Sequence, residues 1–243
     1  MDILTYIKEQ PGVIDRVLEE IPGELSRVPK MSGAKTIYLI GSGTSMNALV
    51  AVEPLLAASG NQRIRIRGPL AFMAEPDGGK GPDSLALILS QTGTSTTTIQ
   101  AVEHARRCGM RTLTLTAERE SPIGRASPEM LVIPVGTEAV GPKTKGYTAS
   151  VLALLLLILG QAGRRIEAPR FATEFSNLIE HCQMACEEMA RAFRGTDFVM
   201  VMAQGRHYAT ALEGSLKITE MGGVPAAGFD TEEAFHGRFH GLS

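Results

Sequence analysis

Residues 36–45 read TIYLIGSGTS, a short apolar run with β-branched and aromatic side chains, followed at once by glycine and hydroxyl residues. Such a run is typical of a buried strand, and glycine with serine or threonine at its end marks a turn. A helical pattern follows over residues 46–58. The stretch therefore predicts a strand, a polar loop and a helix in direct succession.

The same order recurs along the chain. Further strand-like segments lie at residues 63–67, 83–89, 111–116 and 129–135. Helical patterns lie before, between and after the strands, at residues 11–28, from 96 through 107, and at about 144–160. Alternating strands and helices indicate a parallel sheet covered on both faces, with ligands bound outside the carboxyl ends of the strands.

A second unit begins after a Gly-, Arg- and Pro-bearing stretch at residues 161–170 and a helical pattern at 171–193. Residues 197–203 (DFVMVMA) form another apolar run, and Gly205 and a helical pattern follow it. This order repeats the one around Gly43 and indicates the start of a second copy of the same fold. The predicted domains are an N-terminal helical segment (1–34), a first domain (35–160), a linker and helix (161–196) and a partial second domain (197–243).

The composition excludes several classes of protein. The chain has 243 residues, is 44% hydrophobic and carries a net charge of −2, so a large core is expected and a nucleic-acid surface is not. The longest apolar run, residues 151–160, is far shorter than the ~20 residues of a membrane span. The charged N-terminus, MDILTYIKEQ, does not fit a signal peptide, and three cysteines are too few for a disulfide framework. We expect a cytoplasmic protein without a membrane partner.

Residues 90–95, SQTGTS, indicate a phosphate site at the end of a predicted buried strand. Gly93 lets the backbone approach an anion, and hydroxyls and helix N-terminal amides donate hydrogen bonds to it. The alternative is a cluster of helix N-caps, where Ser and Thr are common. The second hydroxyl set in residues 42–45 favours phosphate. Residues 41–45 do not fit a dinucleotide fingerprint, because Met46 occupies the position of its third glycine.

Glu213, Lys217 and Glu220 are spaced to lie on one face of a helix. One interpretation is a solvated row of ion pairs. The surrounding residues 209–216 are mostly small or apolar, however, and favour partial burial, which makes the row a candidate for acid–base chemistry. His236 and His240 lie four residues apart, but no third ligand follows, so we predict no metal site.

Three loops of the chain resemble the signature loops of SIS (sugar isomerase) domains: residues 40–45, 90–95 and 136–147. Residues 211–220 (ALEGSLKITE) and 232–237 (EEAFHG) are similar to the second SIS domain of glucosamine-6-phosphate synthase and its isomerase and deglycase relatives. The resemblance runs from Lys35 to the end. It implies a three-layer α-β-α sandwich with a parallel, flavodoxin-like doubly wound sheet, followed by a partial second copy.

The resemblance also implies roles for individual residues. The expected phosphate-binding residues are Ser45, Ser90, Gln91, Thr92 and Ser95. The expected sugar-binding residues are Gly43, Thr44 and Lys143, the last of which stands where relatives often have a small residue or serine. The expected catalytic residues are Glu220 for proton transfer between C1 and C2, His236 for ring opening, and Glu213 and Lys217 for orienting the substrate and stabilising charge. No cofactor is implied.

The implied function is a phosphosugar isomerase, a deglycase or an aminosugar-phosphate deaminase that acts on a ketose- or aminosugar-6-phosphate. The chain begins with Met-Asp-Ile-Leu and not with the catalytic cysteine of a glutaminase domain, so glutamine is not the expected nitrogen donor. In the relatives the matching histidine reaches the neighbouring subunit's site, which implies a homodimer with shared sites. The alternative is a SIS sensor that binds a phosphosugar without catalysis.

Overall fold

The computed structural model describes residues 2–76, 79–166 and 170–241. The helices are α1 (Ile3–Lys8), α2 (Gln10–Glu24), α3 (Thr44–Ala58), α4 (Pro69–Ala74), α5 (Thr96–Arg107), α6 (Pro122–Ala126), α7 (Lys145–Gln161), α8 (Phe171–Ala192), α9 (Tyr208–Gly222) and α10 (Thr231–Phe235). Short 3-10 turns are η1 (Leu25–Arg27), η3 (Gly205–His207) and η4 (Arg238–Gly241).

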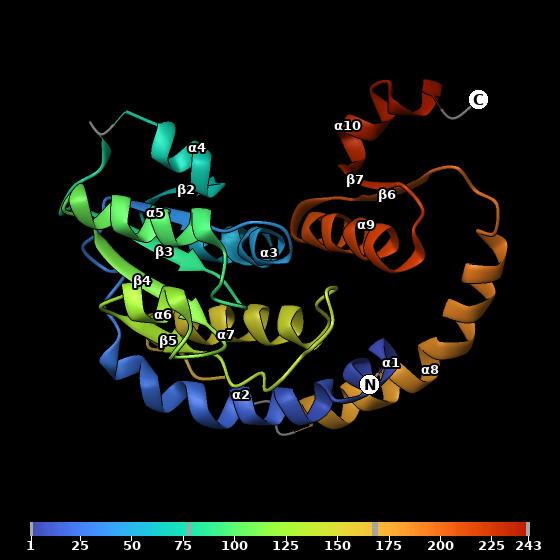
Figure 1. Cartoon of the computed structure of the whole chain (residues 1–243), viewed down its shortest axis with the longest axis horizontal. Coiled ribbons are helices and arrows are strands. Elements are labelled where there is room, and N and C mark those ends of the chain that lie inside the picture. The colour runs from blue at the N-terminus through green and yellow to red at the C-terminus, as the bar shows by residue number, and fades with distance from the viewer. Residues whose placement is uncertain (1, 77–78, 167–169, 242–243) are drawn as a thin grey trace.

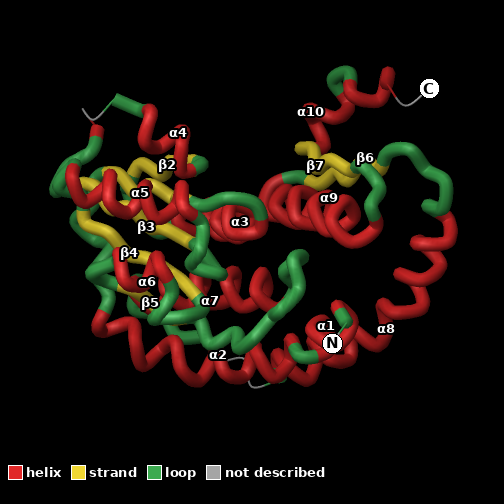
Figure 2. Tube along the Cα trace, viewed as in Figure 1, coloured by secondary structure: helices red, strands yellow, loops and turns green. Residues whose placement is uncertain are grey.

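The main sheet has five parallel strands in the order β2-β1-β3-β4-β5. They are β1 (Thr36–Ile40), β2 (Arg63–Arg67), β3 (Ser84–Leu89), β4 (Arg111–Thr116) and β5 (Met130–Val132). This order is the flavodoxin-like doubly wound one, as expected. Figures 1 and 2 show the sheet with helices above and below it.

Successive side chains of each strand point to opposite faces of the sheet and pack into two separate hydrophobic cores. In β1, Ile37 and Leu39 join the core shared with α2, α3 and α7, whereas Tyr38 and Ile40 join the one shared with α4, α5 and α6. All four side chains are essentially inaccessible to solvent, and each such burial stabilises the fold by about 1.5–3 kcal/mol. The result is a three-layer α-β-α sandwich, which confirms the predicted fold class.

The chain reverses its direction of travel across the sheet at β1. From β1 it crosses to β2 on one side, and then returns to β3 on the other. The register aligns Ile40 of β1 with Ile88 of β3, so the two strands end side by side. The loops that follow them, residues 41–43 and 90–95, therefore meet at the point where such sheets bind ligands.

The second unit is built around α9. The long helix α8 leads away from the first sheet to β6 (Val199–Ala203), and β6 pairs in parallel with β7 (Ala226–Asp230). Helix α9 packs against both strands and against α3 of the first domain. Figure 1 shows α10 on the side of β7 that faces away from α9. Among the described residues, no helix has the length and apolar character needed to cross a membrane.

Candidate functional site

The loop after β1 is a tight turn into α3. Gly43 precedes the helix with a φ of +54°, a conformation that side-chain-bearing residues rarely adopt. The carbonyl oxygen of Ser42 accepts hydrogen bonds from the amides of Ser45 (3.1 Å) and Met46 (3.4 Å). The turn thus brings Thr44 and Ser45, in the first turn of α3, to the end of β1.

The loop after β3 depends on Gly93. Its φ is +68°, its amide donates to Ser90 O at 3.1 Å, and a Cβ at this position would lie 2.2 Å from Ser121 Oγ. Helix α5 then begins at Thr96, and Ser95 makes no capping hydrogen bond to it with its side chain. The Ser95 hydroxyl instead accepts from Thr98 Oγ1 at 2.9 Å. Ser95 therefore leaves the first amides of α5 available to an anion.

A pocket of about 210 Å³ lies between these two loops. Most of its lining residues carry hydroxyl groups, and Lys143 is the one charged residue among them. They are Ser42, Thr44, Ser45, Leu89, Ser90, Gln91, Thr92, Ser95, Thr98, Gly141 and Lys143. The five residues predicted to bind phosphate all belong to this set, as do Thr44 and Lys143, while Gly43 shapes the turn and is not among the lining residues. Sequence reasoning missed Thr98, although its spacing of three from Ser95 on a helix would have indicated it.

A third loop, residues 136–144, closes one side of the pocket. Glu138 is buried and holds the N-terminus of α7: its carboxylate accepts from Thr144 N (2.6 Å), Thr144 Oγ1 (2.7 Å) and Gly146 N (3.2 Å). Lys143 Nζ donates to the carbonyls of Glu138 (2.9 Å) and Val140 (2.6 Å). The loop is therefore fixed by its own charged residues, and Lys143 lines the pocket with its ammonium group already bound.

Gln91 lines the pocket with a side-chain oxygen that accepts no hydrogen bond from the described residues. The residue is buried. Its side chain packs against Gly146 of α7 so closely that a Cβ on Gly146 would lie 2.6 Å from Gln91 Cδ. A buried acceptor of this kind is costly when it stays unsatisfied, and Gln91 Oε1 is left in that state among the described residues.

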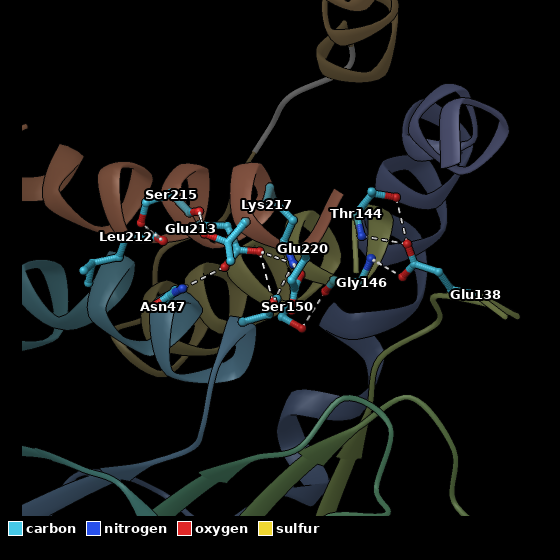
Figure 3. A network of polar contacts seen from close by, with 12 residues as sticks. Asn47, Glu138, Thr144, Gly146, Ser150, Leu212, Glu213, Ser215, Lys217 and Glu220 are labelled. Atoms are coloured by element: carbon cyan, nitrogen blue, oxygen red, sulfur yellow. Dashed lines mark hydrogen bonds and ion pairs between the residues drawn. The ribbon is translucent and has the colours of Figure 1, made fainter. Parts of the chain in front are cut away.

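The acidic and basic residues of α9 form one network with α3 (Figure 3). Lys217 Nζ contacts Glu213 Oε1 at 3.2 Å and Glu220 Oε2 at 2.5 Å. Thr44 Oγ1 donates to Glu213 Oε1 and accepts from Lys217 Nζ, both at 3.1 Å. The side chains of Glu213 and Lys217 are only 7% and 18% exposed, so the alternative of a solvated ion-pair row is wrong for these two residues.

Thr44 joins the network to the pocket, because it lines the pocket and contacts Glu213 and Lys217. Two further residues near Glu213 were missed by sequence reasoning. Asn47 Nδ2 donates to Glu213 Oε2 at 2.8 Å. Burial and, second, the negative charge of Glu213 raise the pKa of Tyr147, on α7, to about 12. Neither contact has a local sequence signal, since both join distant segments.

His236 lies apart from these residues. It is exposed at the end of α10, its backbone amide donates to Glu232 O at 3.2 Å, and it is not among the residues that line the pocket. Within one chain the structure therefore brings Glu213, Lys217 and Glu220 together, and His236 belongs neither to this network nor to the pocket lining. Among the described residues, no three His, Cys, Asp or Glu side chains gather in a way that could hold a metal ion.

Comparison with known proteins gives consistent matches. The family model described as SIS domain matches residues 30–160, more than half of the chain. Over 256 aligned residues the sequence is 27% identical to the glutamine–fructose-6-phosphate aminotransferase (isomerizing) of Gloeobacter violaceus, covering 97% of this chain and 42% of that protein. The chain thus spans less than half of that relative's length.

Two solved structures share the fold over almost the whole chain. The C-terminal domain of glucosamine-fructose-6-phosphate aminotransferase from Francisella tularensis superposes with a TM-score of 0.80 at 17% identity, covering 98% of this chain and 72% of that one. Glucosamine-6-phosphate deaminase from Thermotoga maritima superposes with a TM-score of 0.73 at 24% identity, covering 97% and 72%. At these identities the likeness establishes the fold alone.

Proposed function

Because the chain belongs to the SIS domain family, we propose that it binds a phosphosugar in the pocket between the β1 and β3 loops and acts on it by ring opening and proton transfer between C1 and C2. The proposed substrate is a ketose- or aminosugar-6-phosphate. The proposed reaction class is isomerisation, deglycation or aminosugar-phosphate deamination. The relative named for an isomerizing aminotransferase supports this class.

The observation that carries the proposal is the hydroxyl-lined pocket at the reversal point of the sheet. A phosphate there accepts hydrogen bonds from hydroxyls and from the N-termini of α3 and α5 without needing a free cation. The proposed phosphate ligands are Ser45, Ser90, Gln91, Thr92 and Ser95. Gly43, Thr44 and Lys143 are proposed to face the sugar, where the bound Lys143 would limit the room for groups near it.

The proposed chemistry uses the network on α9. Glu220 removes a proton from one of C1 and C2 and returns it to the other through an enediolate or enolamine. The hydroxyl or amine proton of the first carbon passes to the oxygen or nitrogen on the second, so the numbers of protons balance. Lys217 and Glu213 orient the substrate, and the Lys217 ammonium stabilises the negative charge that develops. Lys217 Nζ lies 2.5 Å from Glu220 Oε2, so the base and the stabilising cation are already adjacent.

His236 is proposed to open the sugar ring in the site of a second subunit. His236 directly follows α10, is exposed, and does not line the pocket of its own chain, which supports this role. A histidine is suited to both halves of ring opening, because it donates and accepts protons near neutral pH. The proposed assembly is therefore a homodimer whose two sites are shared between the chains.

The second candidate is a phosphosugar sensor without catalysis. The observation that favours it is that His236 belongs neither to the α9 network nor to the residues that line the pocket. The two candidates differ in turnover: an enzyme converts a phosphosugar and loses this activity in Glu220→Gln, whereas a sensor converts none. Binding alone cannot separate them, because both use the same phosphate pocket.

The first experiment is thermal unfolding with a panel of phosphosugars: fructose-, tagatose-, glucosamine- and galactosamine-6-phosphate and a fructosamine-6-phosphate. A ligand at 100 times its dissociation constant adds about 2.7 kcal/mol of stability. The unphosphorylated sugars are the matched controls and should add none at the same concentrations. If no phosphosugar stabilises the wild-type chain, the proposed pocket is wrong.

The second experiment assigns the reaction with any sugar that binds. Isomerisation yields the paired aldose or ketose, deglycation releases an amino acid, and deamination releases ammonia. We expect Glu220→Gln to retain binding and to lose turnover, since the amide cannot carry the proton. A variant with unchanged turnover would remove Glu220 from the mechanism, and a wild-type chain that binds but converts none of the panel would favour the sensor.

A further inference from the structure

Helix α3 presents a second polar residue to α9 in addition to Thr44. Asn47 lies one helical turn after Thr44, is buried, and places its Nδ2 2.8 Å from Glu213 Oε2. A carboxylate only accepts hydrogen bonds, so the amide nitrogen of Asn47 is the group that must face it. This contact joins the two domains and lies outside the pocket that receives the phosphosugar.

The two oxygens of Glu213 have different partners. Oε1 accepts from Thr44 and faces Lys217, whereas Oε2 is bonded by Asn47. A carboxylate fixed at one oxygen still turns about its last bond, and a second donor fixes its plane. Asn47 therefore determines where Oε1 points, although it does not itself contact Lys217 through any bond found among the described residues.

Lys217 depends on that direction. Its ammonium group is held between Glu213 Oε1 at 3.2 Å and Glu220 Oε2 at 2.5 Å. Without the Glu213 contact, Lys217 would keep Glu220 and Thr44 as its partners among the described residues. Asn47 thus fixes the carboxylate of Glu213, and Glu213 fixes the ammonium group of Lys217. Lys217 in turn contacts Glu220.

We propose that Asn47 is a positioning residue that fixes the carboxylate of Glu213, and that Glu213 in turn is the fixed anchor of Lys217 and carries no proton in the reaction. A carboxylate whose two oxygens are both engaged by hydrogen-bond donors is suited to hold a cation and poorly suited to exchange protons. The effect of Asn47 on turnover rests on the proposed function, whereas its effect on the position of Lys217 does not.

The test of positioning needs no substrate. Reductive methylation of the ligand-free protein, followed by mass spectrometry of its peptides, gives a modification rate for each lysine. We expect Lys217 to react about fivefold faster in Asn47→Ala than in wild type. It should also react faster than wild type in Asn47→Asp, where a second carboxylate faces Glu213 and displaces it, but by less, because the added negative charge favours the unreactive protonated amine.

Two other lysines in the same samples show whether a faster Lys217 reaction has another cause, either a general loosening of the fold or a difference in the reagent. Lys145 has a 3% exposed side chain and reports general loosening of the first domain, whereas the 81% exposed Lys35 reports the reagent itself. Both rates should match wild type. Ser150→Ala is the matched variant, because it removes a buried hydroxyl that bonds Gly146 O and makes no contact with Glu213 in the described structure. It should leave the Lys217 rate unchanged.

Unchanged Lys217 rates in both Asn47 variants would overturn the proposal, and so would equal acceleration at Lys217 and Lys145. The reversed pair Asn47→Asp/Glu213→Gln keeps the test decisive if a single variant folds poorly. It restores the hydrogen bond with donor and acceptor exchanged, so its unfolding free energy should exceed that of Asn47→Asp alone. Equal stability of the two would contradict the contact itself.

Turnover supplies the last readout. With a sugar that the wild type converts, Asn47→Ala should lower kcat on the order of 10- to 100-fold, as expected for a displaced catalytic group. KM should change little, because Asn47 does not line the pocket, and Ser150→Ala should change neither constant. A rise in KM with unchanged kcat would contradict the role. If Lys217 responds as expected while the wild type converts no sugar, the proposed function fails and the positioning role stands.

Discussion

Gly146 of α7 packs directly on Gln91, with no room for a side chain at this position. A Cβ at this position would lie 2.6 Å from Gln91 Cδ and Nε2, and Gln91 is itself buried. We expect Gly146→Ala to lower the unfolding free energy by about 1–3 kcal/mol, because the buried amide must move. It should also weaken phosphosugar binding in thermal-shift titrations, since Gln91 lines the pocket.

The control for this variant is Gly12→Ala. Gly12 lies in α2, and an added Cβ there would meet only the Arg16 side chain at 3.9 Å. Alanine in a helix without a clash is neutral or stabilises by up to about 1 kcal/mol. If Gly146→Ala is as stable as Gly12→Ala, the Gln91 side chain can move aside without loss of stability, and its present position is not required for folding.

Tyr147 gives a prediction about alkaline pH. Its pKa is raised from 10.0 to about 12 by burial and by the charge of Glu213. Between these values the unfolded chain loses the phenol proton while the folded chain keeps it, so unfolding is favoured as the pH rises. Urea titrations of wild type and Tyr147→Phe should therefore agree below pH 10 and diverge between pH 10 and 12, with the phenylalanine variant losing less stability. If the unfolding free energies of the two proteins change in parallel with pH across this range, Tyr147 has the same pKa in the folded and unfolded chain.

At the scale of elements, Glu138 links a loop to a helix. Its carboxylate accepts three hydrogen bonds at the N-terminus of α7, where it also opposes the positive end of the helix dipole. We expect Glu138→Ala to cost about 2 kcal/mol of unfolding free energy, measured by urea denaturation. Glu138→Gln keeps one acceptor oxygen and should cost less. An alanine variant no less stable than the glutamine variant would show that the loop, and not the cap, holds α7 in place.

The elements themselves were largely predictable, because they depend on local patterns. The sequence predicts strands at residues 36–40, 63–67 and 111–116, and β1, β2 and β4 have these bounds. The predicted strand at 129–135 is too long: β5 covers only Met130–Val132. Pro134 has no amide hydrogen for a ladder, and one last bond, from Ile133 N to Thr116 O at 2.8 Å, closes the pairing.

The site was predictable only where its residues cluster in sequence. Hydroxyls gathered in two strand-end loops indicated the pocket, and a spacing of four and three indicated the row on α9. Asn47 and Glu213 are 166 residues apart, and neither is unusual in its own helix. Their contact arises from the packing of α9 on α3, which no local pattern encodes.

At the scale of the whole molecule, several apolar side chains remain exposed on the second unit and on α8. The largest exposed fractions belong to Met184 (73%) and Phe235 (68%), and Phe235 directly precedes His236. Surfaces of this kind are typical of contacts between proteins. The apolar surface beside His236 is thus compatible with the proposed delivery of this histidine to a second subunit.

A shared site makes a quantitative prediction for mixed dimers. Glu220→Gln and His236→Ala chains should each be inactive alone, provided that turnover of the wild type has been measured. When the two are co-expressed with different tags, half of the dimers formed at random contain one chain of each kind. If each site combines Glu220 of one chain with His236 of the other, one site of such a dimer carries both defects and its second site carries neither. The mixture should then recover about a quarter of the wild-type activity per chain, and purified mixed dimers about half. If His236 instead serves its own chain, every site of the mixed dimer carries one defect and no activity returns.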